Sequence, residues 1–288
     1  MALIQVLIAL APGDAIDLLP NADAVRETLA VEWGLDAPLP VRVARALGRT
    51  AVLDLGESIS YRPGASVTTL LASAAGSSFG ILVPAWVGSV MFALALAWGR
   101  GRARLARAVS ALPAFLAAWL LVTAINAAVW AAMNRGWIER PAFFALPDQE
   151  SGLRTVLAVG VVAVASGNLA ALYAACTTEL DALRSAPFIE AARARGAAIW
   201  PHLVWNLLPP LLDLGAGRAA ALLGTVVVTE KLLLVNGAGA MLWQACRQRD
   251  YPLAMGITLM AAVFVALVRL LADLARLALD PRLSRSAS

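Results

Sequence analysis

Four long stretches of the chain contain no charged residue. They run over Pro63–Gly99, Ala108–Asn134, Thr155–Thr178 and Tyr251–Val268. A helix that crosses a bilayer needs about 20 largely apolar residues, so the first three are long enough and the fourth nearly so. Lipid offers the backbone no hydrogen-bond partner, and the apolar positions lack the strict alternation of a barrel strand. The pattern therefore predicts an all-α integral membrane protein.

Loop charges and the usual span length divide the chain further. We expect transmembrane helices at about residues 68–98, 108–132, 154–177, 207–230 and 252–278. The apolar segment Ala2–Pro12 is about half a span, which brings the expected total to about six. Either this first helix is short or the natural chain begins further upstream. We thus expect a short span plus an extracytoplasmic loop over 1–67, a membrane core over 68–283 and a cytoplasmic tail over 284–288.

Composition and charge agree with a membrane location and give an orientation. Hydrophobic residues make up 60% of the chain and charged residues 15%. The positive charge is almost entirely arginine, and ten of the 23 positively charged residues lie beside the apolar runs, at Arg100–Arg107, Arg184–Arg195 and Arg276–Arg285. The positive-inside rule places these three segments in the cytoplasm. They account for much of the positive charge behind the net charge of +4, so we expect lipid rather than nucleic acid around this chain.

Few side chains offer catalytic or metal-binding chemistry. His202 is the single histidine, and the two cysteines, Cys176 and Cys246, have no metal-ligand spacing such as C-x-x-C. A catalytic or metal role for His202 would need partners that the sequence does not place beside it. We expect neither an enzyme active site nor a metal site on this chain.

A short polar stretch, PFIEAARARG (Pro187–Gly196), separates two of the predicted spans. Proline fits the first turn of a helix and Gly196 is a natural stop, so Phe188–Arg195 is predicted as a two-turn cytoplasmic helix. The helix combines two apolar anchors, Phe188 and Ile189, with small alanines and with charged side chains. It suits docking into a groove of a partner protein. The alternative is a connector that only reverses the chain.

The same stretch resembles the EAA loop of ABC importer permeases, whose pattern is E-A-A, three residues, G, nine residues and I-x-L-P. Asn206 stands where isoleucine is usual, and the matching positions are Glu190, Ala191, Ala192, Gly196, Leu208 and Pro209. Six further landmarks are similar to the dipeptide/oligopeptide/nickel permease family: APGDA, GLDAPLP, DLGES, VVVTE, RDYPL and DPRL. In order, they cover residues 11–283, nearly the whole chain.

The resemblance implies a permease subunit of the bacterial inner membrane that translocates its solute by alternating access. The segment 185–201 would hold the coupling helix, which docks onto a separate cytoplasmic ATPase through Phe188, Glu190, Ala191, Ala192, Arg193, Arg195 and Gly196. ATP and Mg would then bind to the ATPase and no cofactor to this chain, which has no phosphate loop of its own. The other implied partners are a second, usually non-identical permease subunit and an extracytoplasmic solute-binding protein.

This sequence departs from the family pattern at several places. The first helix is short, and Asn236 stands where the family usually has proline. Near the end of the fourth span, Glu179 and Asp181 lie where the family usually has arginines. These departures bear on the substrate rather than on the fold.

Charges at membrane depth are costly and therefore mark candidate functional residues. We take Asp213, Glu230 and Asp273 as candidates for the translocation pathway or gate. Each has a structural alternative. Asp273 can pair with Arg269 four residues away, Asp213 and Arg218 can meet charges of other helices, and Glu230 can lie in water at the interface. Two isolated asparagines in apolar spans, Asn126 and Asn168, are expected to hydrogen-bond across helices.

The leading hypothesis is a transmembrane permease subunit of an ATP-driven importer of peptides or a related small solute. The alternative is an ion-coupled secondary transporter that uses the intramembrane carboxylates, although no inverted repeat or pair of broken helices is evident. A membrane enzyme is a third class, which the lack of a nucleophile and base disfavours. The three hypotheses differ in what they require: the first needs a partner ATPase, the second an ion gradient, and the third needs neither.

Overall fold

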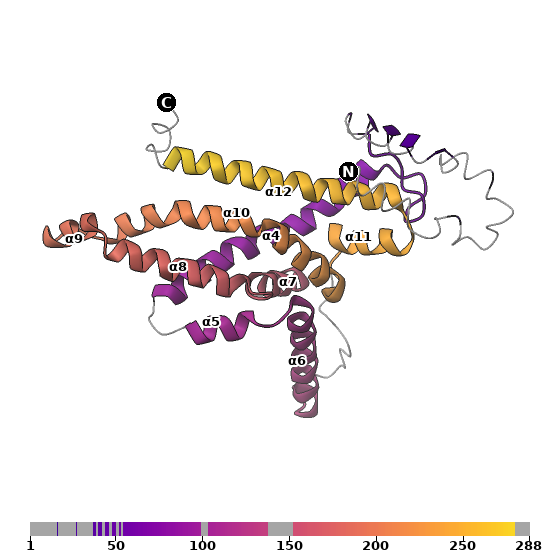
Figure 1. Cartoon of the computed structure of the whole chain (residues 1–288). Helices are drawn as coiled ribbons and strands as arrows, with labels where there is room; N and C mark the ends of the chain where they lie inside the picture. The colour runs from indigo at the N-terminus through magenta and orange to yellow at the C-terminus, as the bar shows by residue number, and fades with distance from the viewer. Residues whose placement is uncertain are drawn as a thin grey trace. The chain divides into compact units, whose positions relative to one another are not determined.

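Every regular element that the structure describes is an α-helix. The computed structural model describes residues 54–98, 103–137 and 152–279, with isolated positions between 16 and 52. Within them, an isolated β-bridge joins Glu57 and Ser66. The helices follow one another in this order (Figure 1): α4 (Val67–Trp98), α5 (Ala103–Ser110), α6 (Ala114–Asn134), α7 (Leu153–Val164), α8 (Asn168–Arg184), α9 (Pro187–Ala194), α10 (Trp200–Leu233), α11 (Ala238–Arg247) and α12 (Tyr251–Leu279).

Four of these helices, α4, α6, α10 and α12, are long and apolar enough to cross a membrane. The pair α7 and α8 makes a fifth span if it is counted as one. Together they correspond to the five long spans expected from the sequence, and the predicted all-α membrane fold is confirmed. The expected first span, Ala2–Pro12, and the tail 284–288 lie outside the described residues. The proposed boundaries after residues 67 and 283 stay predictions.

The third predicted span, 154–177, is not one helix but two, bent by 52° between α7 and α8. Ser166 and Gly167 have φ angles of 55° and 73°. This left-handed conformation cannot continue a right-handed helix. The expectation of one continuous helix failed because serine and glycine are tolerated in apolar helices, so the sequence carries no sign of the break.

The break is closed by hydrogen bonds to the turn between α5 and α6. The amides of Ser166 and Gly167 donate to the carbonyls of Leu112 and Ser110, at 2.9 and 2.8 Å. In return, the Ser166 hydroxyl accepts from the Ala114 amide, and the Ser110 hydroxyl from the Ala170 amide, both at 3.1 Å. The two turns thereby satisfy each other's backbone groups where lipid offers no partner.

Contacts along the chain define two compact units, Met1–Ser77 with Asn236–Val263, and Ser78–Val235 with Phe264–Ser288. In the first unit, the start of α4 packs with α11 and the start of α12. Its core is formed by Val67, Leu70, Leu71, Ala74, Ala238, Met241, Ala245, Leu253 and Ile257. In the second unit, α10 packs against α6, α7 and α8, and α8 also packs against α5.

One buried carboxylate organises the polar part of the first unit. Asp250 is fully buried, and its Oδ2 accepts hydrogen bonds from the Ser58 hydroxyl at 2.5 Å and from the amides of residues 59–61 at 3.0 Å. Its Oδ1 accepts from the Leu253 amide at 3.2 Å and so caps the start of α12. Asp250 and Ser58 belong to the landmarks RDYPL and DLGES, which the sequence does not connect.

Asp250→Ala is expected to destabilise the protein strongly, because it leaves several buried or partly buried donors without an acceptor. Hydrogen bonds to a charged group contribute about 1.5–3 kcal/mol each, so we expect a loss of at least about 3 kcal/mol. The matched control is Asp54→Ala. Asp54 is exposed, and its hydrogen bond from Arg49 holds its pKa below the ordinary value. Thermal unfolding in detergent should separate the two variants, and equal shifts in Tm would contradict the role given to Asp250.

Close packing in the second unit depends on a glycine of α10. The indole of Trp86, from α4, lies directly over Gly215, where an added Cβ would come within 2.6 Å of the ring atom Cζ2. Gly217, two residues along the same helix, has nothing within 4 Å of such a Cβ. Small residues of this kind let transmembrane helices approach closely.

Gly215→Ala is therefore expected to lower stability by about 1–3 kcal/mol, the usual cost of overpacking. Gly217→Ala should have no such cost, since a methyl group there meets open space. Thermal unfolding of the two purified variants measures the difference. A Gly215→Ala protein as stable as Gly217→Ala would show that Trp86 can move aside freely.

Candidate functional site

The polar stretch between two spans forms a short helix, as predicted. α9 begins at Pro187, and Gly196, with φ of 68°, ends it in the left-handed conformation. The amides of Gly196 and Ala197 donate to the carbonyls of Arg193 and Ala192, both at 3.0 Å. These two bonds make the glycine-terminated end that many helices use. α9 therefore has a defined length and a defined exit from its last turn.

One face of α9 is held by the chain itself and the other is free. Ile189 and Ala192, three residues apart on one face, are buried at 0% and 2% exposure. Both were expected to face a partner and instead pack inward, so Phe188 is the apolar anchor that stays exposed, and the alanines that leave room for a partner are Ala191 and Ala194. The remaining predicted coupling residues are exposed: Phe188, Glu190, Ala191, Arg193, Arg195 and Gly196. The exposed face of α9 therefore presents an aromatic ring and charges of both signs, while its other face is buried against the chain.

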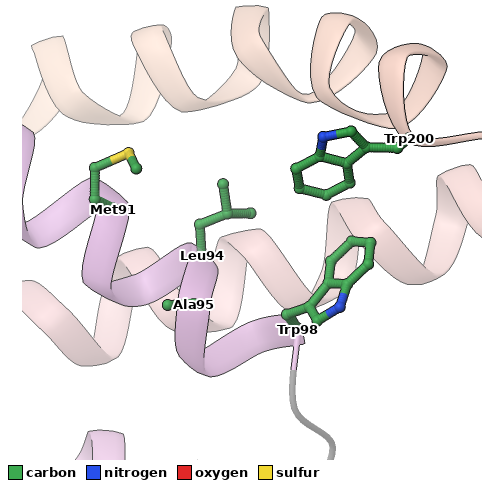
Figure 2. Close-up of a pocket in the computed structure, with 5 residues that line it drawn as sticks. All are labelled: Met91, Leu94, Ala95, Trp98 and Trp200. Atoms are coloured by element: carbon green, nitrogen blue, oxygen red, sulfur yellow. The ribbon is translucent and has the colours of Figure 1, made fainter.

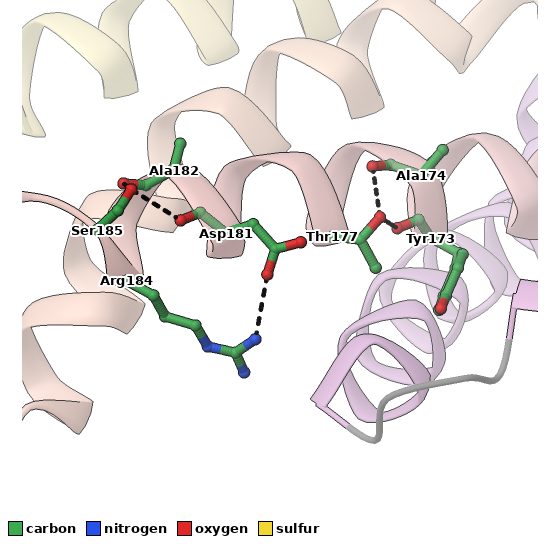
Figure 3. Close-up of polar contacts among 7 residues, drawn as sticks. All are labelled: Tyr173, Ala174, Thr177, Asp181, Ala182, Arg184 and Ser185. Atoms are coloured by element: carbon green, nitrogen blue, oxygen red, sulfur yellow. Dashed lines mark hydrogen bonds and ion pairs between the residues drawn. The ribbon is translucent and has the colours of Figure 1, made fainter.

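The end of α8 that leads into α9 is closed by local polar contacts (Figure 3). The Ser185 hydroxyl donates to the carbonyls of Asp181 and Ala182, at 3.2 and 3.0 Å. The Arg184 guanidinium lies 3.4 Å from the Asp181 carboxylate. One turn earlier, the Thr177 hydroxyl donates to the carbonyl of Ala174 at 2.8 Å. The two Ser185 bonds occupy carbonyls that a helix C-terminus leaves unpaired.

An apolar pocket lies beside the junction of α9 and α10 (Figure 2). It encloses about 540 Å³ and is lined by Met91, Leu94, Ala95, Trp98 and Trp200. Trp98, at the end of α4, meets Trp200, at the start of α10, edge to face with ring centroids 4.6 Å apart. The Arg184 guanidinium lies 5.5 Å from the Trp98 ring, within the range of a cation–π contact. The ends of α4 and α8 and the start of α10 thus meet here, and α8 and α10 are the helices that flank α9 in the sequence.

The charged residues at membrane depth form a different set of pairs from the one that local spacing suggests. Asp213 of α10 forms an ion pair with Arg276 of α12 at 3.1 Å. Within the part of the chain that the structure describes, Arg269 and Asp273 form no ion pair with each other, and both are exposed. The proposed local pair is therefore absent. Arg276 could not be recognised from the sequence as the partner of Asp213, because spacing reveals only partners on the same helix.

Glu230 lies in the protein interior rather than at a wet interface. Its side chain is fully buried, and its Oε1 accepts a hydrogen bond from the Ser78 hydroxyl of α4 at 2.6 Å. The alternative of an interfacial, solvated Glu230 is therefore wrong. Its role in the pathway or gate stays a prediction, as do the roles of Asp213 and Asp273.

Arg218 meets another helix, as expected. Its Nε donates to the Oδ1 of Asn168 at 2.8 Å, and the Nδ2 of Asn168 donates to the Ala163 carbonyl at 3.1 Å. The predicted cross-helix bond of Asn168 is thereby confirmed. For Asn126, the described residues include no such bond. The bend that places Asn168 depends on Ser110 and Ser166, which carry no sequence signal beyond being polar residues in apolar surroundings.

Comparison with known proteins identifies the family. Residues 103–285 match the model of the binding-protein-dependent transport system inner membrane component. The match covers more than half of the chain, including α9 and the helices on either side of it. The chain belongs to this family. It is a transport permease component and not an enzyme, and it is a multi-pass protein of the bacterial inner membrane. This decides against the ion-coupled and enzyme alternatives.

Curated relatives cover nearly the same length. A putative peptide permease of Brucella ovis is 28% identical over 98% of this chain and 92% of its own. The oligopeptide transport system permease AppB of Bacillus subtilis is 23% identical over 96% of this chain and 92% of its own. The dipeptide transport system permease DppB of the same organism is 28% identical over 91% and 84%. The suspected resemblance to peptide-importer permeases is confirmed at the level of the family.

In this permease, Gly196→Ala should loosen the end of α9. A side chain in the left-handed conformation costs about 1–2 kcal/mol, so the amides of Gly196 and Ala197 should exchange their hydrogens about 5–30 times faster. Gly196→Asn is the matched control, since asparagine tolerates this conformation better. Hydrogen exchange over residues 190–199 measures the effect. Equal protection in both variants would mean that the backbone conformation at residue 196 does not hold the helix end.

Proposed function

We propose that this permease component translocates peptides in an ATP-driven importer, and that α9 is the surface that receives the force of ATP hydrolysis. The family implies, in general terms, an ATPase, a solute-binding protein and a second permease. The names of the relatives from Brucella ovis and Bacillus subtilis support peptides as the class of solute. ATP and Mg would bind to the ATPase, and the second permease subunit would be non-identical.

The observation that carries the proposal is the division of α9 into a buried and an exposed face. Ile189 and Ala192 fix the helix to the second unit, so a force applied to its exposed face moves the helices attached to it. Phe188, 45% exposed, would enter an apolar pocket of the ATPase, while Glu190 and Arg193 would make polar contacts around it. An amphipathic helix laid in a groove is a common mode of docking.

The test is co-purification with the ABC ATPase subunits encoded beside this chain. Glu190→Lys reverses a charge on the exposed face of α9, and we expect it to reduce the ATPase recovered by about tenfold or more, equal to about 1.4 kcal/mol of binding free energy. Glu57→Lys makes the same charge change at an exposed position of the predicted extracytoplasmic loop and should leave recovery at the wild-type level.

Two results would contradict the proposal. If Glu190→Lys recovers as much ATPase as Glu57→Lys, α9 is a connector and not the docking surface. If the complete complex, reconstituted in liposomes with its binding protein, takes up no peptide when ATP is supplied, peptides are not its solute. The first result leaves the importer function intact, and the second leaves the docking surface intact.

A further inference from the structure

Arg218 is a positive charge for which the described residues provide no negatively charged partner. It lies near the midpoint of α10 (Trp200–Leu233), a helix long and apolar enough to cross the bilayer. Its Nε is held by Asn168, whose amide is fixed in turn by its bond to the Ala163 carbonyl. For the two terminal nitrogens, Nη1 and Nη2, the described residues provide neither a hydrogen bond nor an ion pair. The nearest carboxylate along α10, Asp213, is already paired with Arg276.

A guanidinium fixed through Nε presents Nη1 and Nη2 as a fork. The side chain is only partly buried, so the fork lies toward the surface of the second unit. A charge at this depth is costly unless it faces protein or a water-filled cavity. Lipid cannot satisfy the four remaining N–H groups. Arg218 therefore calls for an acceptor from outside the unit.

A second donor without a partner lies on the same face of α10. The indole Nε1 of Trp86 is buried and has no hydrogen-bond partner among the described residues. Its ring rests on Gly215, three residues before Arg218 and so on the same side of the helix. Buried donors are rarely left unpaired in folded proteins. This N–H is enclosed in the contact between α4 and α10, so the preference for a ligand with acceptors and negative charge comes from the fork of Arg218.

We propose that Arg218, positioned by Asn168, binds the terminal carboxylate of the transported peptide during its passage through the membrane. A carboxylate accepts two parallel hydrogen bonds from the guanidinium fork, which is the strongest geometry available to arginine. A linear peptide with a free C-terminus carries this group whatever its side chains, so one arginine can serve many peptides. The inference rests on the proposed peptide function.

The experiment uses the complete transporter, with its ATPases, second permease and binding protein, reconstituted in liposomes. The probes are a pool of tripeptides and the same pool amidated at the C-terminus, with uptake measured by mass spectrometry. We expect Arg218→Gln to lower uptake of the free acids by about tenfold, and uptake of the amides by much less. Any preference of the binding protein is common to wild type and variant, so it cancels from this comparison.

Two further variants distinguish a specific effect from a structural one. Arg218→Lys keeps the charge but loses the fork, so the ratio of acid to amide uptake should fall between those of wild type and Arg218→Gln. The matched control is Arg276→Gln, which removes another arginine of the membrane helices that is bound in an ion pair. It should change acid and amide uptake by the same factor and leave their ratio at the wild-type value.

Three outcomes would overturn the inference. If Arg218→Gln lowers acid and amide uptake equally and releases the second permease, Arg218 pairs with a carboxylate of that subunit. If it leaves the ratio unchanged while the complex stays intact, the fork does not meet the peptide terminus. If the wild-type transporter takes up neither pool, the proposed peptide function fails, and this inference fails with it. Only the last outcome touches the proposed function.

Discussion

The lack of hydrogen-bonding partners in lipid governs this structure more than any single contact. Each place where a helix stops inside the apolar core must satisfy its freed backbone groups within the protein. The bend between α7 and α8 does so through the turn between α5 and α6, because the hydroxyls of Ser110 and Ser166 each accept a bond from an amide of the opposite segment, and the carbonyls of Ser110 and Leu112 accept from the amides at the bend. Two helix breaks that would each leave backbone groups unpaired satisfy each other, since each supplies hydrogen-bond partners that the other lacks.

The same constraint links the candidate coupling helix to the middle of the membrane. α8 starts at the closed bend with Asn168 and ends at Arg184, directly before α9. Its 17 residues span about 25 Å at 1.5 Å per residue. Because a helix with all its internal bonds moves as one body, a displacement of α9 reaches Asn168, and through it Arg218, without any bond having to break. α8 thus connects α9 at one end with Asn168 and the charge of Arg218 at the other.

Much of this fold could be predicted because its main signal is one-dimensional. The long spans follow from runs of apolar residues, and α9 follows from Pro187 and Gly196 at its two ends. The bend at Ser166 could not be predicted, because the residues that satisfy it lie more than 50 positions earlier, in a turn with no distinctive composition. The buried Asp250 is similar, since its donors at Ser58 and residues 59–61 are brought to it only by the fold.

The prediction of charge pairs failed for a related reason. Spacing along one helix suggested that Arg269 and Asp273 would meet, whereas the ion pair at this depth joins α10 and α12. Which helices lie side by side is decided by packing of small and large residues, such as Gly215 against Trp86, and not by the charges themselves. Site residues on a short, capped helix such as α9 were accessible to sequence reasoning. Those that depend on helix neighbours were not.

The distribution of satisfied and unsatisfied charge also bears on what moves through the membrane. The carboxylates first considered for the pathway differ in their surroundings: Asp213 has a cation beside it, and Glu230 is enclosed with Ser78. A paired or enclosed carboxylate has its charge or its acceptor atoms engaged already, so a passing solute gains less from it. Arg218 keeps most of its donors for an additional partner. If Arg218 meets the peptide as proposed, a solute with a carboxylate gains a partner there, whereas Asp273, which is exposed and, among the described residues, makes no ion pair with Arg269, is the carboxylate left for a positive charge.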